Sequence, residues 1–273
     1  MMPAALPFLS EISKLQEQML LPVILRLSRG QDEHWIKAGS GPGGDVEPGF
    51  FPIYERCRDY TLTPIEAMHT MYDAAAYVAK AKIPGDVVEC GVWKGGSAMI
   101  AAMALLEHRS PERRLYLYDT YEGTPQMETR DENVGNGPFE LMMQITSFMR
   151  GGNSGVFYVP EQQVRANMQL TGYPADKVIL VKGMVENTLP AQAPGQISLL
   201  HMDSDLYRST YHELTHLYPR LSVGGVLVID DYGTWKGSRE ATDQYFKEKG
   251  VLMYLQRVGD SGARIGIKAA PTQ

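Results

Sequence analysis

The stretch from Gly85 to Ser97, GDVVECGVWKGGS, constrains the fold more than any other part of the sequence. Its paired valines predict a short buried strand that ends at Glu89, and three glycines follow within seven residues. An alanine- and methionine-rich helix is expected from about Ser97 to Glu107. Strand, glycine turn and helix in this order open a doubly wound α/β domain. Glycines let a ligand approach the backbone there, and the helix N-terminus offers free N–H groups.

The spacing of this turn indicates which ligand it suits. A dinucleotide fingerprint requires G-x-G-x-x-G, with the pyrophosphate at the helix end. Here the acid Glu89 comes before the first glycine, Gly91, at the end of the strand. A carboxylate at that point would repel a pyrophosphate but suits a cation, and S-adenosylmethionine carries an ammonium and a sulfonium group. A glycine turn that binds no ligand is the alternative.

A second acid stands at the end of the next predicted strand. Residues 114–119 read RLYLYD, an apolar run that closes with Asp119. An acid at the end of the second strand is the usual partner of the ribose hydroxyls of a nucleoside bound at the first strand. The alternative is that Asp119 only caps the following turn.

Composition excludes several classes of protein. The chain has 273 residues, 44% of them hydrophobic and 21% charged, which is typical of a soluble globular protein with one large α/β domain. Its net charge of −6, without a basic run, argues against a nucleic-acid partner. Two cysteines make no secreted-type framework, so a reduced, cytoplasmic protein is expected. No run of 18 apolar residues is present, so no membrane span is predicted.

The first 50 residues are expected to be a helical extension. Residues 10–27 predict an amphipathic helix whose apolar face would pack on the domain or on another subunit of a homo-oligomer. Residues 39–49 are rich in glycine and predict a flexible loop. The α/β domain with the predicted S-adenosylmethionine site would then run from residue 51 to residue 273, and a helix is expected in it at about Pro64 to Ala81.

An irregular segment from about residue 120 to residue 175 interrupts the α/β pattern. It contains a polar, glycine-rich stretch from Glu128 to Pro138, then a methionine-rich helix and a short helix from Glu161 to Leu170. Such a segment beside a nucleoside site is typical of an inserted lid. A crossover helix with a long loop is the alternative.

Strands and helices alternate again in the second half. Strands are expected at 178–182, 197–203 and 226–230, with helices at 206–221 and 238–249. Two apolar runs, 251–258 and 263–267, predict an antiparallel edge. The alternation indicates a mostly parallel sheet with helices on both faces.

Two acidic pairs follow two of these strands. Asp203 and Asp205 come at the end of one, and Asp230 and Asp231 at the end of the next. The carboxyl ends of parallel strands open on one edge of a sheet, where ligands bind. Four converging carboxylates need a positive partner, and hard oxygen ligands suit Mg²⁺. The alternative is that Asp205 caps a helix and Asp231 closes a turn.

Six motifs together resemble one known family. They are GDVVECGVWKGGS at 85–97, DTYEG at 119–123, KG at 182–183 with TLP at 188–190, MDSDLY at 202–207, LYPRL at 217–221 and GGVLVIDDY at 224–232. The chain resembles the macrocin O-methyltransferase (TylF-type) family, which includes mycinamicin and aminocoumarin sugar O-methyltransferases. The resemblance covers about residues 54–250. The chain departs from the family at 119–125, where DTYEGTP stands for the usual DSFEGLP, and in its first 50 residues.

This resemblance implies a class I methyltransferase fold, with a Rossmann-like, mostly parallel seven-stranded sheet. It implies S-adenosylmethionine and Mg²⁺ as cofactors, and as partner a small-molecule acceptor whose sugar hydroxyl is methylated. It implies Asp203, Asp230 and Asp231 as metal ligands and Asp205 as general base. The residues expected at the cofactor are Glu89, Gly91, Val92, Ser97, Asp119, Thr120, Val185, Glu186 and Asp203.

Other functions are argued against by the same residues. A dinucleotide-dependent oxidoreductase would need the third spaced glycine, and a metal-dependent hydrolase would need no nucleoside site. A binding protein on a methyltransferase fold would not need all four acids. If the chain is a methyltransferase, an acceptor of the catechol type is an alternative to a sugar, because the two adjacent hydroxyls of a catechol could chelate the ion equally well.

Overall fold

A seven-stranded sheet forms the centre of the protein. In the computed structural model, which describes residues 45–134 and 158–271, the strand order is β3-β2-β1-β4-β5-β7-β6. The first five run parallel: β1 (Asp86–Cys90), β2 (Leu115–Asp119), β3 (Val178–Lys182), β4 (Ile197–Met202) and β5 (Leu221–Ile229). β7 (Arg264–Ile267) runs antiparallel to β5 and to the short β6 (Gln256–Arg257). The predicted mostly parallel sheet with an antiparallel edge is confirmed.

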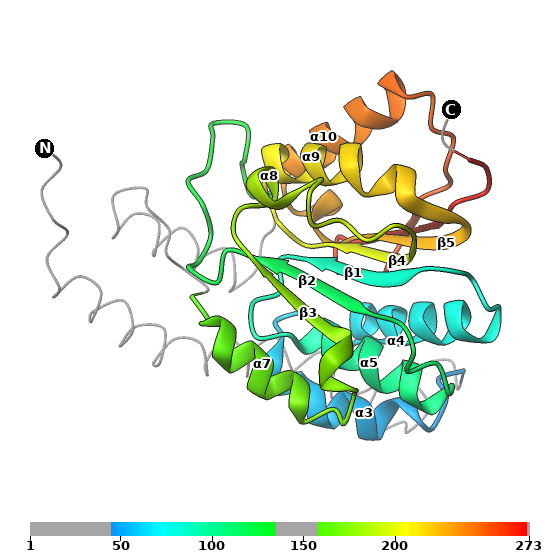
Figure 1. The fold of residues 1–273 in the computed structure, drawn as a ribbon. Helices are drawn as coiled ribbons and strands as arrows, with labels where there is room; N and C mark the ends of the chain where they lie inside the picture. Colours follow the sequence, from blue (N-terminus) through cyan, green and yellow to red (C-terminus); the bar gives the residue numbers. More distant parts are fainter. Residues whose placement is uncertain (1–44, 135–157, 272–273) are drawn as a thin grey trace, which may run out of the picture.

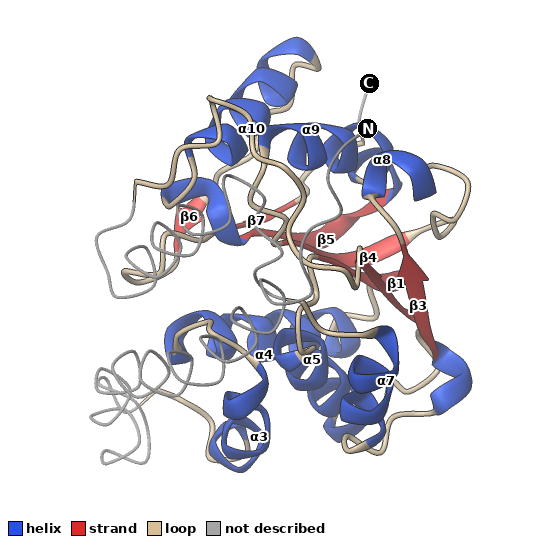
Figure 2. Cartoon of the chain, turned by 90° about the vertical axis from the view of Figure 1, so that its left-hand side faces the viewer, coloured by secondary structure: helices blue, strands red, loops and turns tan. Residues whose placement is uncertain are grey.

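Helices cover both faces of this sheet, which gives three layers (Figures 1 and 2). One face carries α3 (Phe50–Cys57), α4 (Ile65–Lys80), α5 (Gly96–Glu107) and α7 (Glu161–Gln169). The other carries α8 (Val185–Thr188), α9 (Tyr207–His216) and α10 (Lys236–Glu248). Short 3₁₀ turns fill four connections: η1 (Arg58–Tyr60), η2 (Ala175–Lys177), η3 (Tyr218–Arg220) and η4 (Asp230–Gly233).

Alternate residues of the central strands enter two separate cores. Val87 packs in the cluster under α4 and α5, whereas its neighbour Val88 packs in the cluster under α9 and α10. Leu199 and Leu200 divide in the same way. Successive strand side chains point to opposite faces, so strands buried on both sides must be apolar throughout. This explains why these strands appear in the sequence as continuous apolar runs.

Three predicted elements differ from the structure by more than two residues at one end. The helix expected at 206–221 ends at His216, and a 3₁₀ turn follows because Pro219 has no N–H to continue the ladder. β5 begins at Leu221, five residues before the expected start, since Gly224 and Gly225 are accommodated inside the strand. The apolar run at 251–255 is not a strand.

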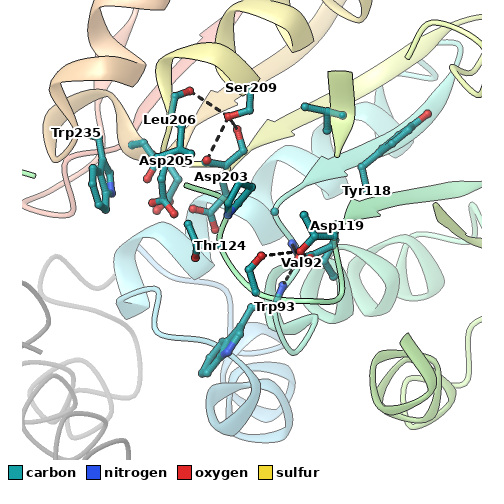
Figure 3. A pocket seen from close by; sticks show the side chains of 18 of the residues that line it. Val92, Trp93, Tyr118, Asp119, Thr124, Asp203, Asp205, Leu206, Ser209 and Trp235 are labelled. Atoms are coloured by element: carbon teal, nitrogen blue, oxygen red, sulfur yellow. Dashed lines mark hydrogen bonds between the residues drawn. The ribbon is translucent and has the colours of Figure 1, made fainter. Parts of the chain in front are cut away.

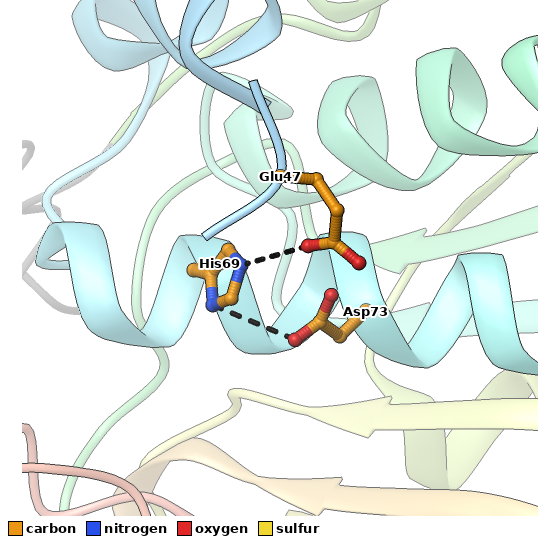
Figure 4. A group of neighbouring side chains, drawn as sticks. All are labelled: Glu47, His69 and Asp73. Carbon is orange, nitrogen blue, oxygen red and sulfur yellow. Dashed lines mark ion pairs between the residues drawn. The ribbon is translucent and has the colours of Figure 1, made fainter. Parts of the chain in front are cut away.

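The start of the described chain is tied to α4 by a histidine between two acids. His69 lies with Nε2 3.6 Å from a carboxylate oxygen of Glu47 and Nδ1 3.5 Å from one of Asp73 (Figure 4). Although these three side chains come close enough for a metal site, the two ring nitrogens face different carboxylates. These contacts bring residues 45–49 against α4, and Val46 is buried there.

Several predicted segments lie outside the described residues. These are the helix at 10–27, most of the flexible loop at 39–49, and the methionine-rich helix of the proposed insertion. Within the described ranges, no helix has the length and apolar character needed to cross a membrane.

Candidate active site

The glycine turn after β1 is shaped by its close approach to the end of β4. Gly91 has φ +80°, and a Cβ atom placed on it would overlap the carbonyl oxygen of Asp203. The backbone N–H of Asp203 donates to the carbonyl of Cys90 at 2.8 Å, which holds the two strand ends together. Only glycine fits this turn, and the first residues of α5 follow directly. The predicted strand, turn and helix are therefore confirmed.

A large cavity opens at this edge of the sheet. It has a volume of about 1010 Å³, enough for a nucleoside cofactor together with an acceptor. All the residues predicted to bind the cofactor line it: Glu89, Gly91, Val92, Ser97, Asp119, Thr120, Val185, Glu186 and Asp203. The acids Asp205, Asp230 and Asp231 line it as well. Residues that are far apart in the sequence thus meet at one cavity (Figure 3).

Glu89 is a buried carboxylate beside the glycine turn. Its side chain is 3% exposed, and its Oε1 lies 3.1 Å from Nδ1 of His201. Its other oxygen, Oε2, is buried and has no hydrogen-bond partner among the described residues. Burial raises the pKa of Glu89, and the hydrogen bond to His201 opposes that rise. A buried acceptor without a partner at a cavity wall suits a ligand that brings a donor or a positive charge.

The carboxylate of Asp119 accepts hydrogen bonds from the turn after β1 and from the turn after β2. Its Oδ2 accepts hydrogen bonds from the backbone N–H groups of Val92, at 2.8 Å, and Trp93, at 3.0 Å (Figure 3). Its Oδ1 accepts from the N–H of Tyr121 at 2.7 Å. The Thr120 hydroxyl lies 3.4 Å from Oδ1, but its proton is directed to the carbonyl of Gly123 at 2.7 Å. The capping role considered from the sequence is therefore present, and Oδ1 keeps a lone pair that could accept from a ribose hydroxyl.

Three carboxylates form a compact cluster at the ends of β4 and β5. Asp203, Asp230 and Asp231 each place one oxygen within 4.8 Å of the others. Burial, followed by repulsion from neighbouring carboxylates, raises the pKa of Asp203 and of Asp231 well above the usual range. A divalent cation would remove this repulsion. The donor set consists of carboxylate oxygens only, which fits Mg²⁺.

Asp205 stands beside this cluster with an unusual backbone. Its φ of +64° lies in the left-handed region, which few residues other than glycine adopt. The strain is held by a hydrogen bond from its N–H to Oδ2 of Asp231, at 2.8 Å. Burial raises the pKa of the Asp205 carboxyl to about 7, while hydrogen bonds to Asp231 and Trp235 lower it. A group with a pKa near neutrality is suited to accept a proton.

The first half of the predicted lid, residues 128–134, is hydrogen-bonded to the rest of the domain. Asp131 is buried, and its carboxylate accepts from the N–H groups of Tyr207, at the start of α9, and of Glu128, both at 2.8 Å. The N–H of Val134 donates to the carbonyl of Thr234 at 2.7 Å. Closure of this segment over the site stays a prediction, and residues 135–138 lie outside the described ranges.

Sequence reasoning missed three residues of the site. His201 contacts Glu89, and Trp93 and Trp235 line the cavity on either side of the acids (Figure 3). His201 carried a signal, because a histidine inside an otherwise apolar strand needs a polar partner when it is buried. The tryptophans carried none, since a single aromatic residue is as often part of a core.

Comparison with known proteins agrees with the geometry. Residues 56–264 match the family model described as macrocin-O-methyltransferase (TylF). A tetracenomycin C 4′-O-methyltransferase that acts on a dimethoxyrhamnosyl form, from Streptomyces olivaceus, is 31% identical over 74% of each chain. Demethyldecarbamoylnovobiocin O-methyltransferase from Streptomyces niveus is 30% identical over 68% of this chain and 67% of its own. The structure of the O-methyltransferase NovP superposes with a TM-score of 0.66 at 27% identity, covering 77% of this chain and 83% of that one.

Proposed function

The chain belongs to the macrocin O-methyltransferase (TylF) family, and on this premise we propose that it methylates a hydroxyl group of a sugar carried by a natural product. Methyl transfer to oxygen from S-adenosylmethionine is the activity of the family. The relatives named above act on tetracenomycin and novobiocin precursors, and the first of these carries a rhamnosyl sugar. The sugar acceptor comes from these relatives, whereas the chemistry rests on this chain's own residues.

One observation carries the proposal more than any other. A buried carboxylate without a partner, Glu89 Oε2, and a cluster of three aspartates open into the same cavity. The first suits a cationic cofactor, and the second suits a divalent cation that binds the acceptor. Their meeting in one space of about 1010 Å³ is what a metal-assisted methyl transfer requires.

We propose that S-adenosylmethionine lies between the glycine turn and α8. Its amino acid part would contact Glu89, Gly91 and Ser97, and its ribose would lie at Asp119 and Thr120. The base would lie beside Val185 and Glu186, which line the same cavity from α8. The sulfonium supplies an electrophilic methyl group when this cofactor is bound.

We propose that Asp203, Asp230 and Asp231 hold Mg²⁺, because their oxygens already converge and repel one another. The ion would supply Lewis acidity, which favours loss of the proton from an acceptor hydroxyl. Asp205 lines the cavity next to this cluster, so its carboxylate would accept that proton as the methyl group passes from sulfur to oxygen. Trp93 and Trp235 line the same cavity and would limit the orientations open to the acceptor.

The charge of the cavity favours an acceptor without phosphate groups. Of the described residues that line it, nine are acidic and one, Arg208, is basic. One cofactor and one divalent cation would neutralise only part of this charge. An attached diphosphate would be repelled by what remains, so a neutral glycoside fits the site better than a nucleotide-activated sugar.

We assign this activity to a domain from about residue 51 to residue 273. The described residues of that range form one three-layer unit, which supports a single domain. Val46 and Phe50 pack in the same core, so this unit begins a few residues before residue 51.

Mass spectrometry tests the proposed function directly. Purified protein is incubated with S-adenosylmethionine, Mg²⁺ and a panel of glycosylated natural products, and each acceptor is examined for a gain of 14 mass units, roughly the mass of a CH₂ group. Rhamnosides of polyketides and aminocoumarins come first, because the relatives named above act on such compounds. Binding of S-adenosylhomocysteine, measured by calorimetry, should accompany activity. Methylation of simple catechols alone would contradict the sugar assignment.

A further inference from the structure

One buried histidine lies between the two halves of the site. His201 belongs to β4 and is 1% exposed. Its Nδ1 lies 3.1 Å from Oε1 of Glu89, and its Nε2 lies 4.0 Å from Oδ1 of Asp230. Each ring nitrogen therefore faces a carboxylate, and the two carboxylates belong to different parts of the site.

Strand register produces this arrangement. His201 is paired with Glu89 on β1, on one side, and with Val228 on β5, on the other. Asp230 follows Val228 by two residues, so it continues on the same face of the sheet. Three adjacent strands thus bring one imidazole between two acids, directly beneath the cavity edge.

Removing this side chain would expose the two acids to each other. The imidazole stands between them, with Nδ1 3.1 Å from the nearest oxygen of Glu89 and Nε2 4.0 Å from that of Asp230. Nδ1 is within hydrogen-bonding distance of its carboxylate, and Nε2 is close enough to limit how the Asp230 side chain can turn. An apolar residue in the same position would fill the core equally well, but it would leave both carboxylates free to rotate.

We propose that His201 is a positioning residue that orients Glu89 toward the cofactor and Asp230 toward the metal ion. It acts on Glu89 through Nδ1, which leaves Oε2 as the oxygen without a protein partner. It acts on Asp230 through Nε2. This inference rests on the proposed function, because it assumes that Glu89 meets the cofactor and that Asp230 is a metal ligand.

Two variants of His201 separate the contact made by Nδ1 from the contact made by Nε2. The amide nitrogen of His201→Asn lies near the position of Nδ1, and that of His201→Gln lies near the position of Nε2. The asparagine variant should keep the bond to Glu89 and lose the contact with Asp230. The glutamine variant should do the reverse. Loss of a group that orients a metal ligand typically lowers metal affinity 10- to 100-fold.

The test measures each ligand in the absence of the other. Calorimetry gives the affinity for S-adenosylhomocysteine without metal, and electron paramagnetic resonance gives the affinity for Mn²⁺ without cofactor. His201→Asn should bind S-adenosylhomocysteine within about threefold of the wild type and Mn²⁺ at least tenfold more weakly. His201→Gln should show the opposite pattern. Equal losses of both ligands in both variants, or no loss in either, would overturn the inference.

A measurement on the wild type covers the case in which a variant does not fold. Protein labelled with ¹⁵N at histidine reports the signals of both ring nitrogens of His201. S-adenosylhomocysteine should shift mainly the Nδ1 signal, and Mg²⁺ mainly the Nε2 signal. If neither signal moves although both ligands bind, the inference is wrong. If the wild type does not bind S-adenosylhomocysteine at all, it is the proposed function that fails.

Discussion

The backbone N–H of Asp205 donates a hydrogen bond to Oδ2 of Asp231, at 2.8 Å. This contact joins the two acidic pairs that follow β4 and β5. It also holds Asp205 at a φ of +64°, where the backbone of a residue with a side chain is strained. Asp231 therefore holds the backbone of the loop after β4 in place. A proposed metal ligand, Asp231, fixes the position of the proposed base, Asp205.

Replacing Asp205 should separate base chemistry from metal binding. Asparagine tolerates the left-handed backbone, so Asp205→Asn should keep the loop and the affinity for Mg²⁺. Turnover should fall on the order of 10²–10⁴-fold, because the acceptor hydroxyl loses its base, and excess Mg²⁺ should not restore it. Steady-state methylation assays together with metal titrations measure both effects.

The matched variant is Asp230→Asn, which removes a proposed metal ligand. It should bind Mg²⁺ more weakly, and added Mg²⁺ should restore part of its activity. Full activity after treatment with a chelator would exclude the metal mechanism. Metal loss in Asp205→Asn, with Asp203→Asn binding normally, would mean that the two acids of the DSD motif have exchanged roles.

Asp119→Ala should weaken cofactor binding and loosen the turn after β1 together. The change removes the acceptor for the N–H groups of Val92 and Trp93 as well as the proposed ribose contact. Hydrogen bonds to a charged group contribute about 1.5–3 kcal/mol, so affinity for S-adenosylhomocysteine should fall roughly tenfold or more. Calorimetry measures the affinity and thermal unfolding the stability. A variant that loses stability but binds as tightly as the wild type would leave Asp119 with the capping role alone.

Replacing Gly91 by alanine should lower the free energy of unfolding far more than the same change at a glycine with free space around it. Gly91→Ala would combine a left-handed backbone with an overlap against the Asp203 carbonyl, and should lower stability by roughly 2 kcal/mol or more. Gly195→Ala is the control, because no described residue other than its two chain neighbours has an atom within 4 Å of the added Cβ. Urea unfolding of both variants gives the comparison. Similar stability for the two would contradict the close approach of β1 and β4.

A buried glutamate behind the site should make stability depend on pH. Glu213, on α9, is fully buried, and burial raises its pKa from 4.5 to about 8. Between these values the folded protein keeps a proton that the unfolded chain releases. The contribution of this group to stability therefore falls as pH rises from about 4.5 to 8, at roughly 1.4 kcal/mol per pH unit.

Glu213→Gln removes this proton exchange. Its stability relative to the wild type should increase with pH across that window, when urea unfolding is measured at pH 5, 6.5 and 8. Glu122→Gln, at a glutamate whose side chain is 70% exposed, serves as control and should leave the pH dependence unchanged. A constant difference between Glu213→Gln and the wild type would mean that Glu213 is not protonated in the folded protein.

The net charge of the acceptor should strongly affect kcat/KM for methylation. A neutral glycoside should have a higher kcat/KM than the same sugar on a nucleoside diphosphate, because nine acidic side chains line the cavity. The difference should shrink at high salt, where charges are screened. Competition assays with the two acceptors provide the ratio. A preference for the nucleotide sugar would show that cations outside the described residues dominate the acceptor site.

Patterns of neighbouring residues were enough to predict the helices, the strands and the edge of the sheet at which the candidate site lies. Continuous apolar runs marked the buried strands, and the glycines after Glu89 marked the turn. Acids placed directly after strands were predicted to meet, because the carboxyl ends of parallel strands share one edge. These signals are local, since each depends on residues that are neighbours in the chain. Where local rules compete, as in the glycines inside β5 or the proline after α9, the predicted boundaries moved by several residues.

Local patterns could not predict which side chains face each other across the strands, because this depends on how distant segments pack. The pairing of Glu89 with His201 depends on the register of β1 and β4, and the approach of His201 to Asp230 depends on that of β4 and β5. A shift by one residue would turn every side chain to the opposite face, and no local pattern records that choice. The bonds from Val92 and Trp93 to Asp119 likewise join segments more than 25 residues apart. Packing of the whole sheet sets these distances, so only the folded chain reveals how cofactor site, metal site and base are connected.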